Sequence, residues 1–317
     1  MSVSIAGNRS GVFGRRGQSN RLVQKRPWGA IVEFLGPTVL VYVAFLIIPL
    51  FTTFYNSFHT LKMSGGEWST EFVGLKHYIA LFTKDLFFKL AIRNSIIWAV
   101  VSPFLEIPIA FVLAYVIHQK VPLKRFYRVI WFLPMLLSWV AVGALFRWVL
   151  NADWGVVNLV LRPLGLDHNW LGDIKTAIWS LISVTTWKYV GFNFVILLAA
   201  LGSIPQDMLD AAAVDGTNQF QLIKHVILPM IRQTFVNLML LCYVGKMRVF
   251  DLVWVMTRGA PMGYTETVAT YVQKRAFEWN TFDLGYPSAI AVVWFVVVFA
   301  SWLLLTRWLQ RREALEF

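Results

Sequence analysis

Several ionisable side chains stand inside long apolar stretches of this sequence, and Lys188 and Lys246 lie deepest in them. A charged residue costs roughly 2.5–3.5 kcal/mol at the centre of a membrane helix on insertion scales, so each lysine is a candidate functional group. The polar and aromatic side chains near them are Tyr189, Asn193, Asn237 and Tyr243. Sugars are held by hydrogen bonds and by stacking on aromatic rings, so this set is suited to lining a carbohydrate path. The two cations would favour an acidic or phosphorylated sugar.

The same residues have a structural interpretation, which the sequence leaves open. Tyr and Trp anchor membrane helices at interfaces, and polar side chains join helices to one another. Glu106 stands between Pro103 and Pro108, so a kinked helix with a buried partner for the carboxylate is expected there. Arg147 and Asp251 lie near the ends of apolar stretches, where a structural role is favoured.

The residues needed for catalysis are missing. No loop of the form G-x-x-x-x-G-K-[ST] occurs, so the chain is not expected to bind ATP phosphates in that way. The five histidines have no metal-ligand spacing, and Cys242 is the single cysteine. We therefore predict no catalytic residue, no metal ligand and no cofactor bound by this chain.

Composition indicates that the elements holding these residues lie in a membrane. Of 317 residues, 57% are hydrophobic and only 15% charged, with a mean hydropathy of +0.59. The hydrophobic share is higher and the charged share lower than in soluble domains, which average about 45–50% apolar and about 25% charged residues. The net charge of +12 fits cationic cytoplasmic loops better than nucleic-acid binding. No apolar run precedes residue 28, so a cleavable signal peptide is not expected.

We predict an all-α integral membrane protein, with a basic cytoplasmic arm at 1–28 and a transmembrane domain at 29–317. Six stretches are long enough to cross a bilayer, at about 33–58, 94–117, 129–150, 176–201, 230–256 and 284–306. Cations in the arm, in the loop 119–128 and in the C-terminal tail place both termini in the cytoplasm. The loops 59–93, 151–175 and 258–283 are then external.

The cytoplasmic loop 203–229 is predicted to be ordered. Ser203 and Gln206 have capping-box spacing for a helix over about 204–214. Gly216 can end that helix with a positive φ, and Thr217 can cap a second short helix through about Val226. Pro229 then separates this segment from the fifth span. The loop should therefore fold as helix, turn, helix across the cytoplasmic face.

Two segments of the sequence carry a family resemblance. The run IPQDMLDAAAVDG at 204–216, followed by Phe220 and by ILP at 227–229, resembles the EAA loop of ABC-transporter permease subunits. The run FDLVWVMTRGAP at 250–261 and the residues beyond it to 277 are similar to carbohydrate-importer permeases of the maltose and glycerol-phosphate type. The segment FVGLKHY at 72–78 resembles the first external loop of the same subfamily.

The resemblance implies a permease of a type I ABC importer in a bacterial cytoplasmic membrane, working by alternating access. It implies partners as well: two ABC ATPase subunits that hold ATP and Mg²⁺, a second homologous permease in a heterodimer, and an external solute-binding protein. The substrate would be a sugar or oligosaccharide, including acidic, alginate-like or phosphorylated ones. The alternatives are an ABC permease for an amino acid or an anion, and a stand-alone secondary transporter.

The resemblance also implies which residues couple the permease to its ATPases. The coupling residues would be Asp210, Ala211, Ala212, Asp215, Gly216, Phe220, Leu228 and Pro229. The family usually has Glu where Asp210 stands, which puts a direct ion pair at that position in doubt. Ala260 stands where the family often has a second Gly, with little expected effect.

Overall fold

The computed structural model describes residues 28–64, 67–119, 122–279 and 283–311, so almost all of the predicted basic arm lies outside the described residues. The chain divides into two compact units, residues 1–50 and 51–317. In the first unit, α1 (Trp28–Tyr42) continues through a π-helical turn (Val43–Ile47) into the start of α2 (Ile48–Asn56). Its apolar side chains, including Phe34 and Phe45, are exposed, as expected for a helix in contact with lipid.

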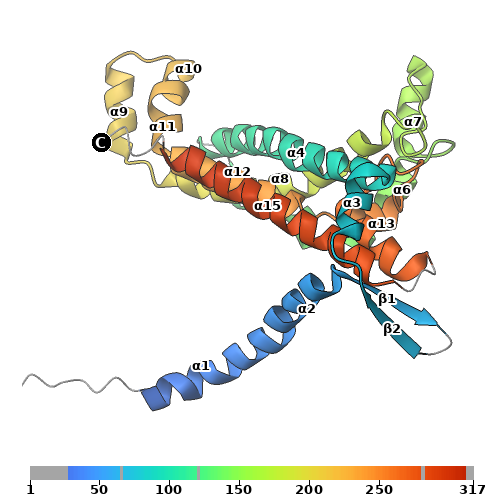
Figure 1. The fold of residues 1–317 in the computed structure, drawn as a ribbon. Coiled ribbons are helices and arrows are strands. Elements are labelled where there is room, and N and C mark those ends of the chain that lie inside the picture. The colour runs from blue at the N-terminus through green and yellow to red at the C-terminus, as the bar shows by residue number, and fades with distance from the viewer. Residues whose placement is uncertain (1–27, 65–66, 120–121, 280–282, 312–317) are drawn as a thin grey trace, which may run out of the picture. The chain divides into compact units, whose positions relative to one another are not determined.

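The second unit is built from helices, which agrees with the predicted all-α class (Figure 1). Its long helices are α4 (Leu86–His118), α8 (Ala177–Gly202), α12 (Arg232–Lys246) and α15 (Gly285–Arg311). The shorter helices are α3 (Lys76–Thr83), α5 (Lys124–Leu136), α6 (Trp139–Val149), α7 (Val156–Leu161), α9 (Gln206–Val214), α10 (Gln219–Leu222), α11 (Leu228–Met230), α13 (Asp251–Met256) and α14 (Val268–Gln273). One-turn 3-10 or π segments follow α7, α10 and α14, at Arg162–Leu164, Ile223–Ile227 and Lys274–Glu278.

A β-hairpin stands in the first predicted external loop, where the sequence analysis expected no strand. Its strands β1 (His59–Ser64) and β2 (Glu67–Phe72) are antiparallel, with His59 opposite Phe72. The Asp283 carboxylate accepts the Leu61 amide at 3.0 Å and the Gly285 amide at 2.9 Å. The hairpin is thereby tied to the start of α15.

α4 is the central helix of the second unit and contributes to all three of its hydrophobic clusters. One cluster joins α4 to α8 and α12 around Phe194, the second joins it to α6, α8 and α13 around Trp98, and the third joins it to α3, α14 and α15 around Phe88. Helix α4 runs continuously through Pro103 and Pro108.

The number of spans depends on how broken helices are counted. Four helical stretches among the described residues are long and apolar enough to cross a membrane, namely 32–56, α4, α8 and 285–308 of α15. Two bent pairs raise the number to six: α5 with α6, at 96°, and Gln219–Met230 with α12, at 71°. The sequence predicted six spans and a separation at Pro229, close to the second bend, but no bend within the third span.

The predicted third span contains the first break. Helix α5 ends at Leu136, and the Ser138 hydroxyl caps α6 by accepting the Ala141 amide at 3.2 Å. Pro134 has no amide hydrogen and lies in the last turn of α5.

The predicted fifth span, drawn to Met256, is also interrupted. Helix α12 ends at Lys246, and α13 starts only at Asp251. The intervening carbonyls find side-chain donors: Trp294 Nε1 donates to Met247 O at 3.2 Å, and Thr267 Oγ1 donates to Val249 O at 2.9 Å. In a continuous helix these carbonyls would accept backbone amides. Here the two side-chain donors take the place of those amides and stabilise the non-helical stretch between α12 and α13.

The loop 203–229 is helix, turn, helix, but its caps differ from those predicted. The Ser203 hydroxyl bonds back to Ala200 O, so the capping box with Gln206 does not form. Asn218 rather than Thr217 caps the second helix, in a reciprocal box with Gln221. The Thr217 hydroxyl instead donates to Ala212 O at 2.8 Å.

The end of this loop also differs from the prediction. Pro229 does not separate the loop from α12, because helical structure runs through it to Met230 and the bend falls at Ile231. Gly216 has a φ of +71°, which is the positive value predicted for the turn after α9.

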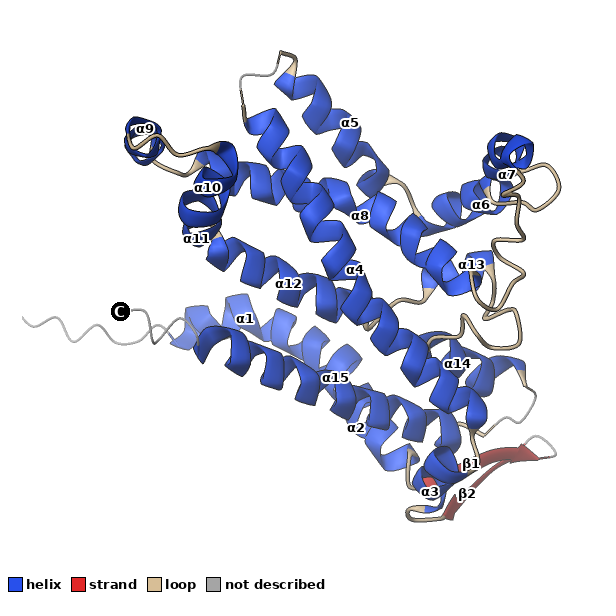
Figure 2. Cartoon of the chain, turned by 90° about the horizontal axis from the view of Figure 1, so that it is seen from above, coloured by secondary structure: helices blue, strands red, loops and turns tan. Residues whose placement is uncertain are grey.

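Within the second unit, the predicted external and cytoplasmic segments gather at opposite ends of the long helices. Helix α7 and the β-hairpin lie at one end, together with α13 of the predicted fifth span, and α9, α10 and α11 lie at the other (Figures 1 and 2). The Tyr115 hydroxyl, near the end of α4, donates to the Gln219 side chain and so ties α10 to that end of the unit.

Candidate functional site

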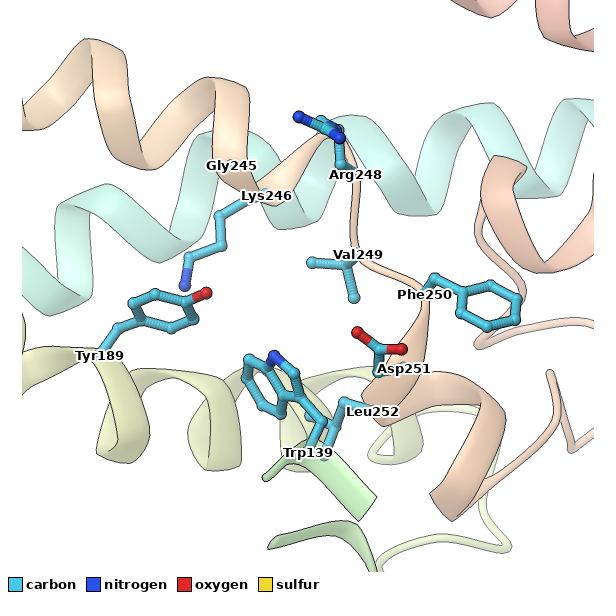
Figure 3. Close-up of a pocket in the computed structure, with 9 residues that line it drawn as sticks. All are labelled: Trp139, Tyr189, Gly245, Lys246, Arg248, Val249, Phe250, Asp251 and Leu252. Atoms are coloured by element: carbon cyan, nitrogen blue, oxygen red, sulfur yellow. The ribbon is translucent and has the colours of Figure 1, made fainter. Parts of the chain in front are cut away.

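The residues that follow the break between α5 and α6 and those at the break between α12 and α13 line one cavity of about 250 Å³ (Figure 3). Backbone that is not helical is tolerated at membrane depth only where it is buried in protein or lines a cavity. The lining comes from the start of α6, from α8, and from the break between α12 and α13. Its residues are Trp139, Tyr189, Gly245, Lys246, Arg248, Val249, Phe250, Asp251 and Leu252.

A buried ion pair borders this cavity. Lys246 Nζ lies 2.6 Å from Glu106 Oε1, and the two side chains are 3% and 0% exposed. The same ammonium stands 3.5 Å from the centroid of the Tyr189 ring, toward which it reaches in Figure 3. Glu106 thus has the buried partner that the sequence predicted. The charge of Lys246 is already balanced before any ligand arrives.

The second oxygen of Glu106 is held from two other helices. Asn193 Nδ2 on α8 lies 3.4 Å from Glu106 Oε2, and the Cys242 thiol on α12 lies 3.8 Å from it. The thiol also faces Asn193 Oδ1 at 3.5 Å. One carboxylate on α4 therefore joins α4, α8 and α12 at the level of the cavity.

Two aromatic rings form one wall of the cavity. The rings of Trp139 and Tyr189 have centroids 5.7 Å apart at a tilt of 44°. Lys188, next to Tyr189 in sequence, is not among the residues that line the cavity. Its ammonium lies 4.8 Å from the Trp139 ring centroid and bonds to backbone carbonyls at the end of α5.

The two exposed charges of the cavity are Arg248 and Asp251. Asp251 is the first residue of α13, where a carboxylate is stabilised by the helix dipole. Arg248 lies in the break just before it. Together they offer a hydrogen-bond donor group and an acceptor group to a polar ligand.

The structure therefore divides the residues predicted for a substrate path. Tyr189 and Lys246 line the cavity, and Asn193 lies behind them on Glu106. Asn237 is exposed beside Gln233, away from the cavity. Tyr243 lines a different, apolar cavity of about 330 Å³ between α4, α12 and α15.

Trp139, Phe250 and Arg248 are cavity residues that the sequence analysis did not assign to the path. The signals were present but ambiguous. Trp139 follows a serine that caps a helix, inside what looked like an unbroken span. Arg248 stands in an apolar stretch, but nothing in the sequence places it in one cavity with Trp139.

The predicted coupling residues lie together at the far end of α8 and α12. Asp210, Ala211 and Asp215 are exposed, and Ala212 is buried against the loop. Phe220 is 71% exposed, and Val214 beside Gly216 is 88% exposed. Leu228 and Pro229 stand in α11, just before the bend into α12. This end of the unit thus presents apolar side chains on a pair of short helices, of which α10 has a capping box.

In the part of the chain that the structure describes, no group of three His, Cys, Asp or Glu side chains is arranged to hold a metal ion.

The sequence matches a known family over residues 106–314, described as "Binding-protein-dependent transport system inner membrane component". It is 31% identical over 272 residues to the probable ABC transporter permease protein YurN of Bacillus subtilis, covering 84% of this chain and 91% of that protein. It is 29% identical over 265 residues to the trehalose/maltose transport system permease protein MalF of Thermococcus litoralis, covering 83% and 87%.

The fold is similar to that of a solved transporter. A chain of a bacterial ABC transporter involved in the import of the acidic polysaccharide alginate superposes with a TM-score of 0.77 at 25% identity, over 90% of this chain and 96% of that one. Both comparisons agree with the resemblance carried by residues 204–229 and 250–277.

Proposed function

Because the chain belongs to the family of binding-protein-dependent transport system inner membrane components, we propose that it is the permease through which an ABC importer moves a sugar or oligosaccharide into the cytoplasm. Membership makes it a multi-pass protein of the inner membrane. Its role in transport follows from the family, and a sugar or oligosaccharide as its substrate is our proposal.

The cavity at the two helix breaks is the observation that carries the sugar proposal. It combines a tilted aromatic pair with a guanidinium and a carboxylate, which suits the apolar faces and the hydroxyls of a sugar ring. Relatives support the same class: MalF by its name, and the arabinooligosaccharides transport system permease protein AraP of Bacillus subtilis, which is 27% identical over 84% of this chain.

An acidic sugar is the substrate that the alginate importer suggests. Lys246 is neutralised by Glu106, and Lys188 is bonded to backbone carbonyls. Recognition of a carboxylate or phosphate in the cavity therefore falls to Arg248, whose guanidinium suits planar oxyanions.

Energy is proposed to come from partner ATPase subunits that carry ATP and Mg²⁺. The helix pair α9–α10, with its exposed Val214 and Phe220, would seat in these partners. The coupling residues from Asp210 to Pro229 would then pass the motion of the ATPases to α8 and α12. A rigid helix is needed because a flexible loop would absorb the motion.

The proposed assembly contains two ATPase subunits, a second permease in a heterodimer and an external binding protein. Both termini would lie in the cytoplasm, with α7, α13 and the hairpin outside. In Figure 1, α7 and the hairpin lie at the opposite end of the long helices from α9, α10 and α11, as their assignment to opposite sides of the membrane requires.

Native mass spectrometry of the chain, purified from its own host in mild detergent, tests the assembly first. We expect a complex with one similar-sized membrane subunit and two ATPases. That complex, placed in proteoliposomes with its binding protein, should take up labelled oligosaccharides when ATP is enclosed. Uptake of amino acids or inorganic anions instead would refute the sugar assignment. Uptake without ATPases would indicate a secondary transporter.

A further inference from the structure

The end of α5 exposes backbone carbonyls in the middle of a predicted membrane span. The last carbonyls of any helix lack partners within the helix, and in hydrocarbon no water replaces them. Here one side chain bonds to three carbonyls at and just after the helix end, of which Pro134 O also accepts the Leu137 amide at 3.3 Å. Lys188 Nζ donates to Pro134 O at 3.1 Å, to Met135 O at 3.3 Å and to Leu137 O.

This contact stabilises both the buried lysine and the C-terminal end of α5. Lys188 is only 3% exposed, so its ammonium needs acceptors inside the protein. The C-terminal end of a helix carries partial negative charge, which a cation stabilises. The Lys188 ammonium on α8 therefore stabilises the C-terminal end of α5. All three of its N–H groups are used there, so none is left to donate to a ligand in the cavity.

A glycine on the same face of α8 completes the contact. Gly191 is three residues after Lys188, which places the two one above the other on the helix surface. A Cβ at Gly191 would lie 1.7 Å from Trp131 O, so only glycine admits the α5 backbone here. Lys188 and Gly191 together form a seat on α8 for the last turns of α5.

The seat fixes where the chain resumes. Directly after the break, Ser138 caps α6, and Trp139 enters the cavity with its ring facing both Tyr189 and the Lys188 ammonium. Resting on the transport function proposed above, we propose that Lys188 is a positioning residue: it holds the broken span so that Trp139 serves as the stacking surface for a sugar ring. Its role is not contact with an acidic substrate.

The two roles predict different kinetics, measured as uptake by the complete transporter in proteoliposomes. If Lys188 positions Trp139, Lys188→Met raises the KM about tenfold for neutral and acidic sugars alike, with kcat changed less than about threefold. Lys188→Arg, which keeps the charge and the donors, stays within about threefold of the unmodified KM. Lys175→Met, at an exposed lysine in the loop before α8, is the matched control and leaves both constants unchanged.

A double substitution tests whether the effect passes through Trp139. Adding Lys188→Met to Trp139→Leu should raise the KM no further than Trp139→Leu does alone, because the positioned ring is already gone. Additive effects would overturn the proposal. A loss confined to acidic sugars in Lys188→Met would overturn it as well, and would make Lys188 a substrate contact.

Hydrogen exchange provides a readout independent of transport. In the purified complex, Lys188→Met should speed exchange of the amides at 139–145 in α6, with no change at 194–200 in α8. Unchanged exchange in α6 would refute the seat. Hydrogen exchange tests the seat even if the unmodified transporter carries no sugar. The absence of sugar uptake would refute the proposed function and not the seat. If Lys188→Met does not assemble, Lys188→Arg and Trp139→Leu carry the test: the first must keep the KM and the second must raise it.

Discussion

Glu106 and Lys246 form an ion pair of two side chains that are only 0% and 3% exposed. Neither group could be buried alone, because an unpaired charge in an apolar interior is very costly. At 2.6 Å they neutralise each other, and Asn193 and Cys242 face the remaining carboxylate oxygen. The pair brings α4, α8 and α12 to one point beside the cavity.

Breaking this pair from one side should destabilise the protein more than removing it entirely. Lys246→Met leaves Glu106 buried and unpaired, so we expect a loss of about 3–5 kcal/mol in the free energy of unfolding. Combining it with Glu106→Leu should recover most of the loss. Denaturant titration of the purified protein in detergent measures both. A double variant as unstable as the single one would show that the pair is not the cause.

Arg248 should set the preference of the cavity for charge. A hydrogen bond to a charged group contributes about 1.5–3 kcal/mol, which corresponds to a factor of roughly 10–150 in affinity. We therefore expect Arg248→Gln to raise the KM for an acidic oligosaccharide by at least about tenfold, and that for a neutral one only slightly. Arg248→Lys serves as the control that keeps the charge. Equal effects on both sugars would contradict the assignment.

At the scale of elements, the sequence predicted the helical class but not the breaks within the predicted third and fifth spans. Apolar composition is the same for a continuous helix and for one broken at Leu137, so hydropathy cannot separate them. What breaks the third span is a set of distant partners: Lys188 on α8 for the carbonyls and Gly191 for the close approach. In the fifth span the partners are Trp294 and Thr267, again far away in sequence.

The caps of the coupling segment illustrate the opposite problem, in which several local signals compete. Ser203, Thr217 and Asn218 all have side chains that cap helices, and the sequence analysis chose the first two. The structure uses Asn218, whose side chain accepts the Gln221 amide at 2.9 Å while the Gln221 side chain accepts the Asn218 amide at 2.9 Å. Ser203 and Thr217 instead bond to carbonyls at the ends of the preceding helices.

Asn218→Ala should therefore fray α10. Loss of a capping side chain costs about 1 kcal/mol, which is roughly a fivefold faster exchange of the α10 amides if they open locally. Ser203→Ala, which removes no N-terminal cap, should leave α10 exchange unchanged. Hydrogen exchange followed by mass spectrometry at 219–223 distinguishes the two. Equal protection in both variants would show that the box does not hold α10.

At the scale of the whole second unit, the chain itself links the coupling end to the cavity. Helix α8 carries Tyr189 and leads directly into α9, and the segment from α10 leads through the bend at Ile231 into α12. Helix α12 ends with Lys246 in the cavity, and its 15 residues span about 22 Å at 1.5 Å per residue. We expect a tilt of α9 and α10 to move both helices that meet at Glu106, because only three residues separate α8 from α9 and one separates α11 from α12.

This arrangement predicts that the surface at the coupling end can be altered without harming the fold. Phe220 is 71% exposed, so Phe220→Asp should leave the thermal unfolding of the isolated chain nearly unchanged. In the proposed assembly the same change places a carboxylate in an apolar contact with an ATPase, and desolvating it weakens the complex. Native mass spectrometry should show loss of the ATPase subunits.

The control is Val160→Asp, at a 67% exposed apolar residue of α7 at the opposite end of the unit, which should retain the ATPase subunits. Retention in both variants would mean that α10 is not the docking element, and α9, with Val214 at its end, would be the next segment to test by the same substitution.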